Sequence, residues 1–214
     1  MVINAETASE LSRFLLQIKA IQIQTANPFH WASGWLSPIY CDNRKTLSHP
    51  NIRNFVKNEL KQVLLNEHSN VEVIAGVATG AIAIGALVAD IMDLPFIYVR
   101  SSSKGHGLGN QIEGDLSVGK KVVVIEDLIS TGMSSLNAVK CLRDAGMEVL
   151  GMASIFTYGF DQATDNFKDE ACSLISLADY STLLEVALQE KYIHQDEMEV
   201  LKNWRKDPSN WKGK

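Results

Sequence analysis

The chain has 214 residues, of which 46% are hydrophobic and 21% are charged. This balance is typical of a soluble globular protein that buries a full core, and it excludes disorder, a collagen-like chain and a small disulfide scaffold. The 20 basic and 25 acidic residues give a net charge of −5. Because the chain is mildly acidic and has no basic run, we expect neither nucleic acid nor a membrane surface as a partner.

Three further features indicate where the protein works. The scattered cysteines Cys41, Cys141 and Cys172 predict reduced thiols rather than a disulfide framework or a metal cluster. Residues 1–10 lack the basic and apolar regions of a secretory signal. Residues 73–89 carry no charge, but they are shorter than the roughly 20 residues of a membrane-spanning helix, and their glycines favour a buried strand, a turn and a buried helix. These features predict a cytoplasmic protein.

The pattern of apolar residues predicts the elements in chain order. An amphipathic helix is expected over residues 7–20, short strands and turns over 27–44, and a second helix from Pro50 to about residue 67. Strands then alternate with helices, and apolar strands separated by helices predict a parallel sheet covered on both faces. We expect strands at 71–78, 95–100, 121–126, 148–157 and 172–177, helices at 80–92 and 133–145, a polar linker after residue 157, and C-terminal helices at 179–191 and 195–205.

Ligands of an open α/β sheet bind beyond the carboxyl ends of the strands, so the loops after residues 78, 100 and 126 are the places to search. The third loop reads EDLISTGMSS over residues 126–135. Its hydroxyls and Gly132 precede a helix, whose first N–H groups lack partners and attract anions. The loop has neither the Gly-Lys-Ser/Thr of a triphosphate-binding loop nor the three glycines of a dinucleotide-binding one.

Two carboxylates, Glu126 and Asp127, stand beside this anion site and would repel a phosphate. They suit the hydroxyls of a sugar, or a Mg²⁺ ion that a polyphosphate carries with it. A phosphate on one side and vicinal hydroxyls on the other describe a phosphorylated ribose. The alternative is a plain strand end followed by a Ser/Thr helix cap, but the coincidence of the carboxylates with the run of hydroxyls favours the ribose.

These motifs resemble a known family. EDLISTGMS (126–134) resembles the phosphoribosyl pyrophosphate (PRPP) signature of the type I phosphoribosyltransferases. YVRSSSKGHGLGNQIEG (98–114) resembles the mobile catalytic loop of the orotate phosphoribosyltransferases, SGWLSPIYCDNR (33–44) their N-terminal segment beside the base, and AGVATGAIAIGA (75–86) their pyrophosphate-facing loop. Together the segments cover most of residues 30–135 in the family's order.

The resemblance implies the Rossmann-like α/β fold of the type I phosphoribosyltransferases, as one domain over residues 1–214. An N-terminal helix and a small hood would occupy about 1–45, the central parallel sheet about 70–178 and the C-terminal helices 179–214. The implied enzyme is a pentosyltransferase that moves ribose 5-phosphate from PRPP to orotate, giving orotidine 5′-monophosphate and pyrophosphate in pyrimidine synthesis. Its Mg²⁺ cofactor would arrive with PRPP, without direct protein ligands.

The resemblance also implies that residues 101–118 form a lid. A long loop inside a compact domain is usually functional, and lids exclude water while they complete a site. Lys104 would offer a point charge to the pyrophosphate, Arg100 a bidentate fork, and His106 a proton or hydrogen bond to the leaving group. In this family the lid closes over the neighbouring subunit's site, which implies a homodimer with these residues acting across the interface. Lys104, His106 and Asp127 are the implied catalytic residues.

The implied binding residues form two groups. Orotate would contact Ser130, Arg44 and Tyr40, although Arg44 has the alternative of a surface salt bridge. Trp31 and Trp35 are expected to pack rather than to stack on a ligand. PRPP would contact Arg100, Lys104, His106, Glu126, Asp127, Leu128, Ile129, Ser130, Thr131, Gly132, Met133 and Ser134.

Three alternative functions stay open at this point. A phosphoribosyltransferase for another base is disfavoured by KGHGLGNQIEG (104–114), which favours orotate. A regulatory module that senses PRPP without turnover would need a partner-binding or nucleic-acid-binding segment, and none is visible. A plain nucleotide-binding α/β protein would carry the glycine motif that is missing.

Overall fold

The computed structural model describes residues 4–31, 33–101, 111–115 and 118–213. At its centre lies a six-stranded sheet in the order β10-β9-β8-β5-β6-β7. Neighbouring strands pair in parallel, except that β6 and β7 pair antiparallel. The predicted parallel sheet is confirmed, with one short antiparallel strand added at its edge. The strands are β5 (Val73–Val77), β6 (Phe96–Val99), β7 (Ile112–Glu113), β8 (Lys121–Ile129), β9 (Glu148–Thr157) and β10 (Leu174–Asp179).

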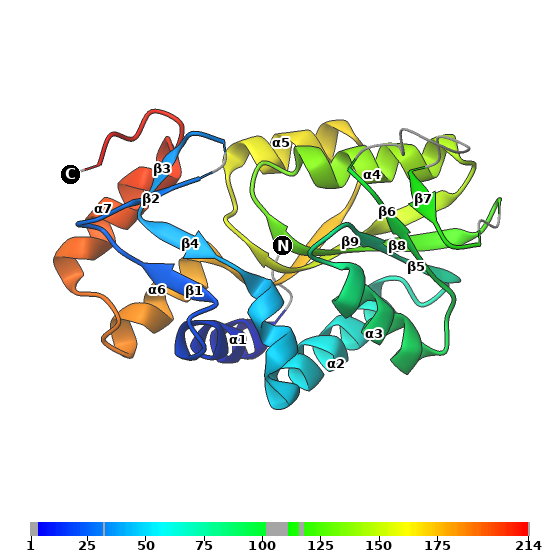
Figure 1. Ribbon diagram of the computed structural model, residues 1–214, viewed down its shortest axis with the longest axis horizontal. Helices are drawn as coiled ribbons and strands as arrows, with labels where there is room; N and C mark the ends of the chain where they lie inside the picture. The colour runs from blue at the N-terminus through cyan, green and yellow to red at the C-terminus, as the bar shows by residue number, and fades with distance from the viewer. Residues whose placement is uncertain (1–3, 32, 102–110, 116–117, 214) are drawn as a thin grey trace.

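Helices cover both faces of the sheet, as predicted (Figure 1). On one face lie α4 (Met133–Asp144) and α5 (Asp161–Asp169), and on the other lie α1 (Ala5–Gln17), α2 (Pro50–Glu67) and α3 (Ile82–Met92). Because successive strand residues point to opposite faces, β8 supplies both cores. Val123 and Ile125 pack in the core under α1, α2 and α3, whereas Val122 and Val124 pack in the core under α4 and α5.

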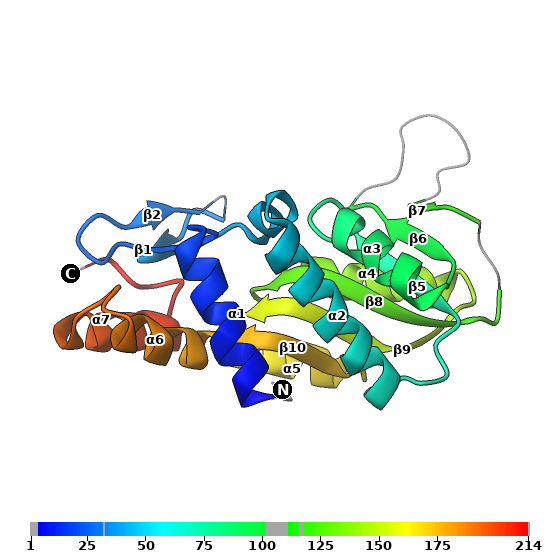
Figure 2. The ribbon, with the colours of Figure 1, turned by 90° about the horizontal axis from the view of Figure 1, so that it is seen from below.

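A hood built from the N-terminal strands stands beyond the carboxyl end of the sheet (Figure 2). In it β1 (Ile21–Ile23) pairs antiparallel with β4 (Ile39–Cys41), β2 (Phe29–His30) pairs with β3 (Leu36–Ser37), and a short 3-10 helix, η1 (Asn43–Ser48), follows. The C-terminal helices α6 (Tyr180–Gln189) and α7 (Gln195–Lys206) support the hood from below. The fully buried Trp204 fastens it, since its indole N–H donates to the Leu36 carbonyl oxygen at 3.2 Å.

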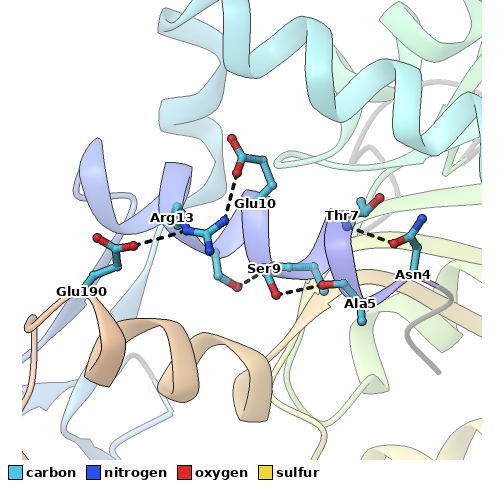
Figure 3. A network of polar contacts seen from close by, with 9 residues as sticks. Asn4, Ala5, Thr7, Ser9, Glu10, Arg13 and Glu190 are labelled. Carbon is cyan, nitrogen blue, oxygen red and sulfur yellow. Dashed lines mark hydrogen bonds and ion pairs between the residues drawn. The ribbon is translucent and has the colours of Figure 1, made fainter.

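Polar contacts mark both ends of α1 (Figure 3). At the start, the side-chain oxygen of Asn4 accepts from two N–H groups of the first turn, at 2.8 and 3.1 Å, which is the usual role of a helix N-cap. Near the end, Arg13 forms ion pairs with Glu10 at 3.1 Å and with Glu190, just after α6, at 3.3 Å. Exposed ion pairs of this kind stabilise little, so the buried apolar face that includes Leu15 holds α1 in place.

The uncharged stretch 73–89 forms β5, a turn and α3, as its glycines predict. The close approach of these elements depends on Gly76, where a Cβ would lie 2.8 Å from the Ala81 carbonyl oxygen. Among the described residues, no helix combines the length and the hydropathy needed to cross a bilayer.

Strand β8 is longer than its apolar run predicts. The strand expected at 121–126 continues to Ile129 by pairing with β9, so Glu126 and Asp127 lie inside the strand rather than at its end. Backbone pairing needs no apolar side chain, and the sequence pattern therefore ended the strand too early. On the other side, β5 pairs with β8 only as far as Gly76, which lies opposite Ile125. The edge of β8 that faces β5 is therefore open from Glu126 onward.

Helix α5 lies where the sequence predicts a polar linker after residue 157, and that prediction is wrong. The helix is nine residues long, DQATDNFKD. Only Ala163 and Phe167 are buried in it, at 3% and 4% exposure. One apolar pair at i, i+4 is too short a pattern to predict a helix, and α5 forms because this pair packs into the core beside α4.

Candidate active site

The open edge of β8 borders a cavity of about 570 Å³. The turn after β5, the end of β6, the exposed edge of β8 and the first turns of α4 meet around it, and the hood closes one side. The described parts of all three loops indicated by the sequence therefore converge here. The polar lining residues are Asp42, Arg44, Thr79, Arg100, Ser101, Gln111, Glu126, Asp127, Ser134 and Asn137. We call this space the charged cavity.

A second cavity of about 480 Å³ adjoins the first, since Cys41 and Leu128 line both. Its walls are mainly aromatic, and we call it the aromatic cavity. Trp31 packs edge-on against Trp204 with ring centroids 5.6 Å apart, as expected of a packing residue, but it also lines this cavity. The other lining residues are His30, Ser33, Trp35, Tyr40, Ser130, Thr131 and Tyr158.

Glu126 is the buried carboxylate of the site, at 5% exposure. One of its oxygens accepts from the Ser135 hydroxyl at 2.7 Å, and the other accepts from the backbone N–H of Asp127 at 3.0 Å. Burial, followed by the negative charge of Asp127, raises the pKa of Glu126 well above its ordinary value. The two adjacent carboxyls thus favour a cationic or hydroxyl-bearing ligand that would relieve their repulsion.

The backbone of Asp127 is fixed by Asn43, which is 1% exposed. The Asn43 Nδ2 donates to the Asp127 carbonyl oxygen at 2.6 Å, and the Cys41 Sγ donates to Asn43 Oδ1 at 3.3 Å. Burial and nearby carboxylates raise the pKa of the Cys41 thiol, which keeps its proton and its role as donor. The thiol therefore sets the orientation of the amide. Sequence reasoning missed Asn43, because its partner lies 84 residues away.

The turn between β5 and α3 also approaches Asp127. A Cβ at Gly80 would lie against the Asp127 carboxylate, so only glycine leaves that carboxylate its place. The peptide bond between Ala78 and Thr79 in this turn is cis. The turn belongs to the segment that resembles the pyrophosphate-facing loop, and the structure brings it to the charged cavity.

Arg100 stands at the base of the segment expected to form the lid. Its backbone N–H donates to the Gln111 carbonyl at 2.8 Å, and Gln111 Nε2 donates back to the Arg100 carbonyl at 3.4 Å. Its guanidinium lies 3.5 Å from Glu113 Oε1 and lines the charged cavity. Lys104 and His106 lie outside the described residues.

Arg44 forms a surface salt bridge and also borders a cavity, so both roles predicted for it are compatible with its position. It pairs with Asp42 at 2.6 Å, as a surface salt bridge would, and its hydrogen bond lowers the pKa of that carboxyl. It also lines the charged cavity. Tyr40 and Ser130, the other residues expected at orotate, line the aromatic cavity, so the structure divides the three expected orotate contacts between two cavities.

The remaining residues expected at PRPP lie along one continuous segment. Ser134 lines the charged cavity and Thr131 the aromatic cavity. The Ile129 side chain is fully buried in the core, which leaves only its backbone for a ligand. Gly132 is the N-cap of α4 with φ of +78°, a conformation that favours glycine. Met133 opens α4 and is 52% exposed.

The donor set also bears on magnesium. Within the described ranges, no three His, Cys, Asp or Glu side chains gather as a metal site. Mg²⁺ is usually held by one or two carboxylates together with substrate phosphates and water. Glu126 and Asp127 fit this mode, in which the ion is bound largely through a phosphorylated substrate.

Comparison with known proteins gives a consistent result. A family model described as a phosphoribosyl transferase domain matches residues 45–190. The orotate phosphoribosyltransferase of Phocaeicola vulgatus is 58% identical over 197 residues, which cover 92% of this chain and 93% of that protein. The protein of the same name from Listeria monocytogenes is 50% identical over 202 residues, covering 94% and 97%.

Solved structures share the fold. UMP synthase from Leishmania donovani superposes with a TM-score of 0.78 and 27% identity, over 92% of this chain and 42% of its own. The orotate phosphoribosyltransferase of Aeropyrum pernix has a TM-score of 0.75 and 28% identity, over 86% of this chain and 99% of its own.

Proposed function

The chain belongs to the phosphoribosyltransferase family, among its orotate phosphoribosyltransferases, and from this premise we propose how its two cavities divide the reaction. The enzymes of this group are glycosyltransferases of pyrimidine synthesis. They transfer ribose 5-phosphate from PRPP to orotate and release orotidine 5′-monophosphate and pyrophosphate.

The ribose and the pyrophosphate occupy the charged cavity, and orotate occupies the aromatic cavity. The observation that carries this division is that Leu128 and Cys41 line both cavities. The two cavities are therefore adjacent, and a base bound in one lies next to a ribose bound in the other. Ser130 and Tyr40 face the base. Arg44, at the mouth of the charged cavity, guides the anionic substrates.

The 5′-phosphate binds at residues 130–134, where the loop passes from the aromatic to the charged cavity. The N–H groups at the start of α4, which the helix itself does not use, and the hydroxyls of Ser130, Thr131 and Ser134 supply donors, and the helix dipole favours the negative charge. Binding at this remote group aligns the reacting atoms.

Glu126 and Asp127 hold the ribose hydroxyls and offset the positive charge that develops at the anomeric carbon. Arg100, Lys104 and His106 neutralise the departing pyrophosphate. When bound with PRPP, Mg²⁺ supplies positive charge to the phosphate oxygens. A ring nitrogen of orotate attacks the anomeric carbon, so the mechanism needs no nucleophilic side chain.

We further propose that the active form is a homodimer in which each lid serves the neighbouring subunit, and that it works in the cytoplasm. The family resemblance of residues 98–114 supports the first proposal. The cysteines, all of them free thiols, support a reducing compartment for the second.

One assay tests the substrate assignment. The protein is mixed with Mg²⁺, PRPP and orotate, and the loss of orotate absorbance is followed. We expect turnover with orotate and none with adenine, guanine or hypoxanthine. Turnover with a purine base but not with orotate would overturn the assignment, and binding of PRPP without turnover of any base would favour a regulatory module.

A further inference from the structure

A loop that binds an anion through its N–H groups has to turn its carbonyl oxygens elsewhere, and those oxygens then need donors of their own. Two such oxygens are paired near the start of α4. The Ile129 carbonyl accepts from the backbone N–H of Tyr158 at 3.0 Å, which continues the β8–β9 pairing. The Thr131 carbonyl lies beyond the sheet, and its donor is a side chain, the Nδ2 of Asn166 at 2.9 Å.

The neighbouring residue of α5 makes a second contact with the same loop. A Cβ at Gly132 would lie 2.6 Å from the ring of Phe167, so the glycine backbone packs directly on that ring. Phe167 is buried in the core and anchors α5. Two successive residues of α5 thus contact two successive residues of the loop, one through a hydrogen bond and one through van der Waals packing.

We propose that Asn166 is a positioning residue for the phosphate-binding loop. Its amide holds the Thr131 carbonyl away from the ligand, and the N–H groups at the start of α4 then stay directed at the 5′-phosphate. Asn166 is half-buried and lines neither cavity, so it acts through the loop and not on the substrate. The inference rests on the proposed binding of the 5′-phosphate at residues 130–134.

The test compares two phosphorylated ligands that are proposed to bind at opposite ends of the charged cavity. Ribose 5-phosphate carries the 5′-phosphate, whereas Mg²⁺-pyrophosphate probes the other end of the charged cavity. Asn166→Asp places an oxygen opposite the Thr131 carbonyl, and Asn166→Ser is too short to reach it. Calorimetric titration of Asn166→Asp should show the Kd for ribose 5-phosphate rising about tenfold, equivalent to about 1.4 kcal/mol. The Kd for pyrophosphate should stay within about twofold of the wild-type value, and Asn166→Ser should show the same split with a smaller rise.

The matched control is Gln162→Glu, the same amide-to-carboxylate change at an exposed position of α5, and it should leave both affinities unchanged. Equal losses of both ligands in the Asn166 variants, or no loss of either, would overturn the positioning role. The double variant Ser130→Ala/Ser134→Ala alters the loop directly. If it weakens ribose 5-phosphate while the Asn166 variants do not, only the positioning role is wrong; if it also has no effect, the proposed 5′-phosphate site is wrong as well.

Discussion

Two neighbours position Asp127. The Asn43 amide binds its backbone carbonyl, and Gly80 leaves room for its carboxylate. Replacing Asn43 by Asp changes the donor into an oxygen that faces the Asp127 carbonyl and adds a charge to a buried site. A hydrogen bond replaced by a buried unpaired charge costs about 2–3 kcal/mol. We expect kcat/KM for PRPP to fall by about 30- to 150-fold, measured in steady-state assays, together with a lower Tm.

Asn54→Asp is the matched control for this change, because it places the same substitution on the exposed surface of α2. It should leave kcat/KM and Tm close to the wild-type values. If Asn43→Asp retains kcat/KM within about threefold, Asn43 does not position Asp127.

Glu126 gives the ligand-free protein a pH dependence. Its pKa is raised in the folded state by burial and by Asp127, so the folded protein holds this proton more tightly than the unfolded chain does. The stability from this group is complete below the unfolded pKa and is lost as the pH rises through the raised folded pKa. Glu126→Gln does not ionise and therefore removes this loss of stability at higher pH. We expect the Tm of the variant to exceed the wild-type Tm by a margin that grows from pH 5 to pH 8 and reaches about 3 °C.

Differential scanning calorimetry across this pH range measures the margin. The same variant should turn over more slowly, because it no longer offers a carboxylate to the ribose and the developing positive charge. Parallel curves of Tm against pH for the two proteins would contradict the raised pKa.

At the scale of elements, the base of the proposed lid is fixed. The two hydrogen bonds between Arg100 and Gln111 hold together the described residues on either side of 102–110, at the border of the charged cavity. Lys104→Ala removes a charge that the lid is proposed to bring to the pyrophosphate. We expect kcat to fall about 100-fold, while the Kd for PRPP, measured by calorimetry, changes by less than about threefold, because the 5′-phosphate loop and the carboxylates are intact.

Lys120→Ala is the control for this variant. Lys120 is exposed and pairs with Glu72, and its loss should change neither kcat nor Kd. A Lys104→Ala enzyme with the wild-type kcat would contradict a catalytic lid.

The elements also show what the sequence could predict. Strands and helices with long apolar patterns, such as β5, β8, α2 and α4, are recognisable from local sequence. The end of β8, the strand β7 and helix α5 depend on partners distant in the chain. The same holds for the site: Glu126 and Asp127 are recognisable by their motif, whereas Asn43 and Asn166 matter through contacts across 84 and 35 residues. Local patterns carry no information about such pairs.

For the whole molecule, the net charge of −5 is compatible with strongly anionic substrates. Overall charge governs broad, non-specific binding, whereas a specific site depends on the donors within a few ångströms. Here the cations Arg44 and Arg100 border one cavity, and the N–H groups and hydroxyls at the start of α4 need no net charge. A lid that brings Lys104 and His106 would add positive charge only when the site closes.

A lid from the neighbouring subunit makes a quantitative prediction about mixed dimers. Lys104→Ala lacks the lid charge, Asp127→Asn lacks the ribose carboxylate, and each homodimer should be nearly inactive. In a heterodimer with lids acting across the interface, one site has both defects and the other has none. Heterodimers purified through two different tags should therefore show about half of the wild-type activity, and an unfractionated equal mixture about a quarter.

If each lid serves its own subunit, both sites of the heterodimer carry one defect and the activity stays at the level of the single variants. A dimer of two Lys104→Ala chains that carry the same two different tags controls for the effect of the tags and of the exchange. If no doubly tagged species forms on co-expression, the dimer itself is contradicted. Since mass action sets the dimer population, the wild-type activity per chain should also fall on dilution below the dimer dissociation constant. Adding excess Asp127→Asn chains should restore this activity, because each wild-type chain then pairs with a chain whose lid is intact.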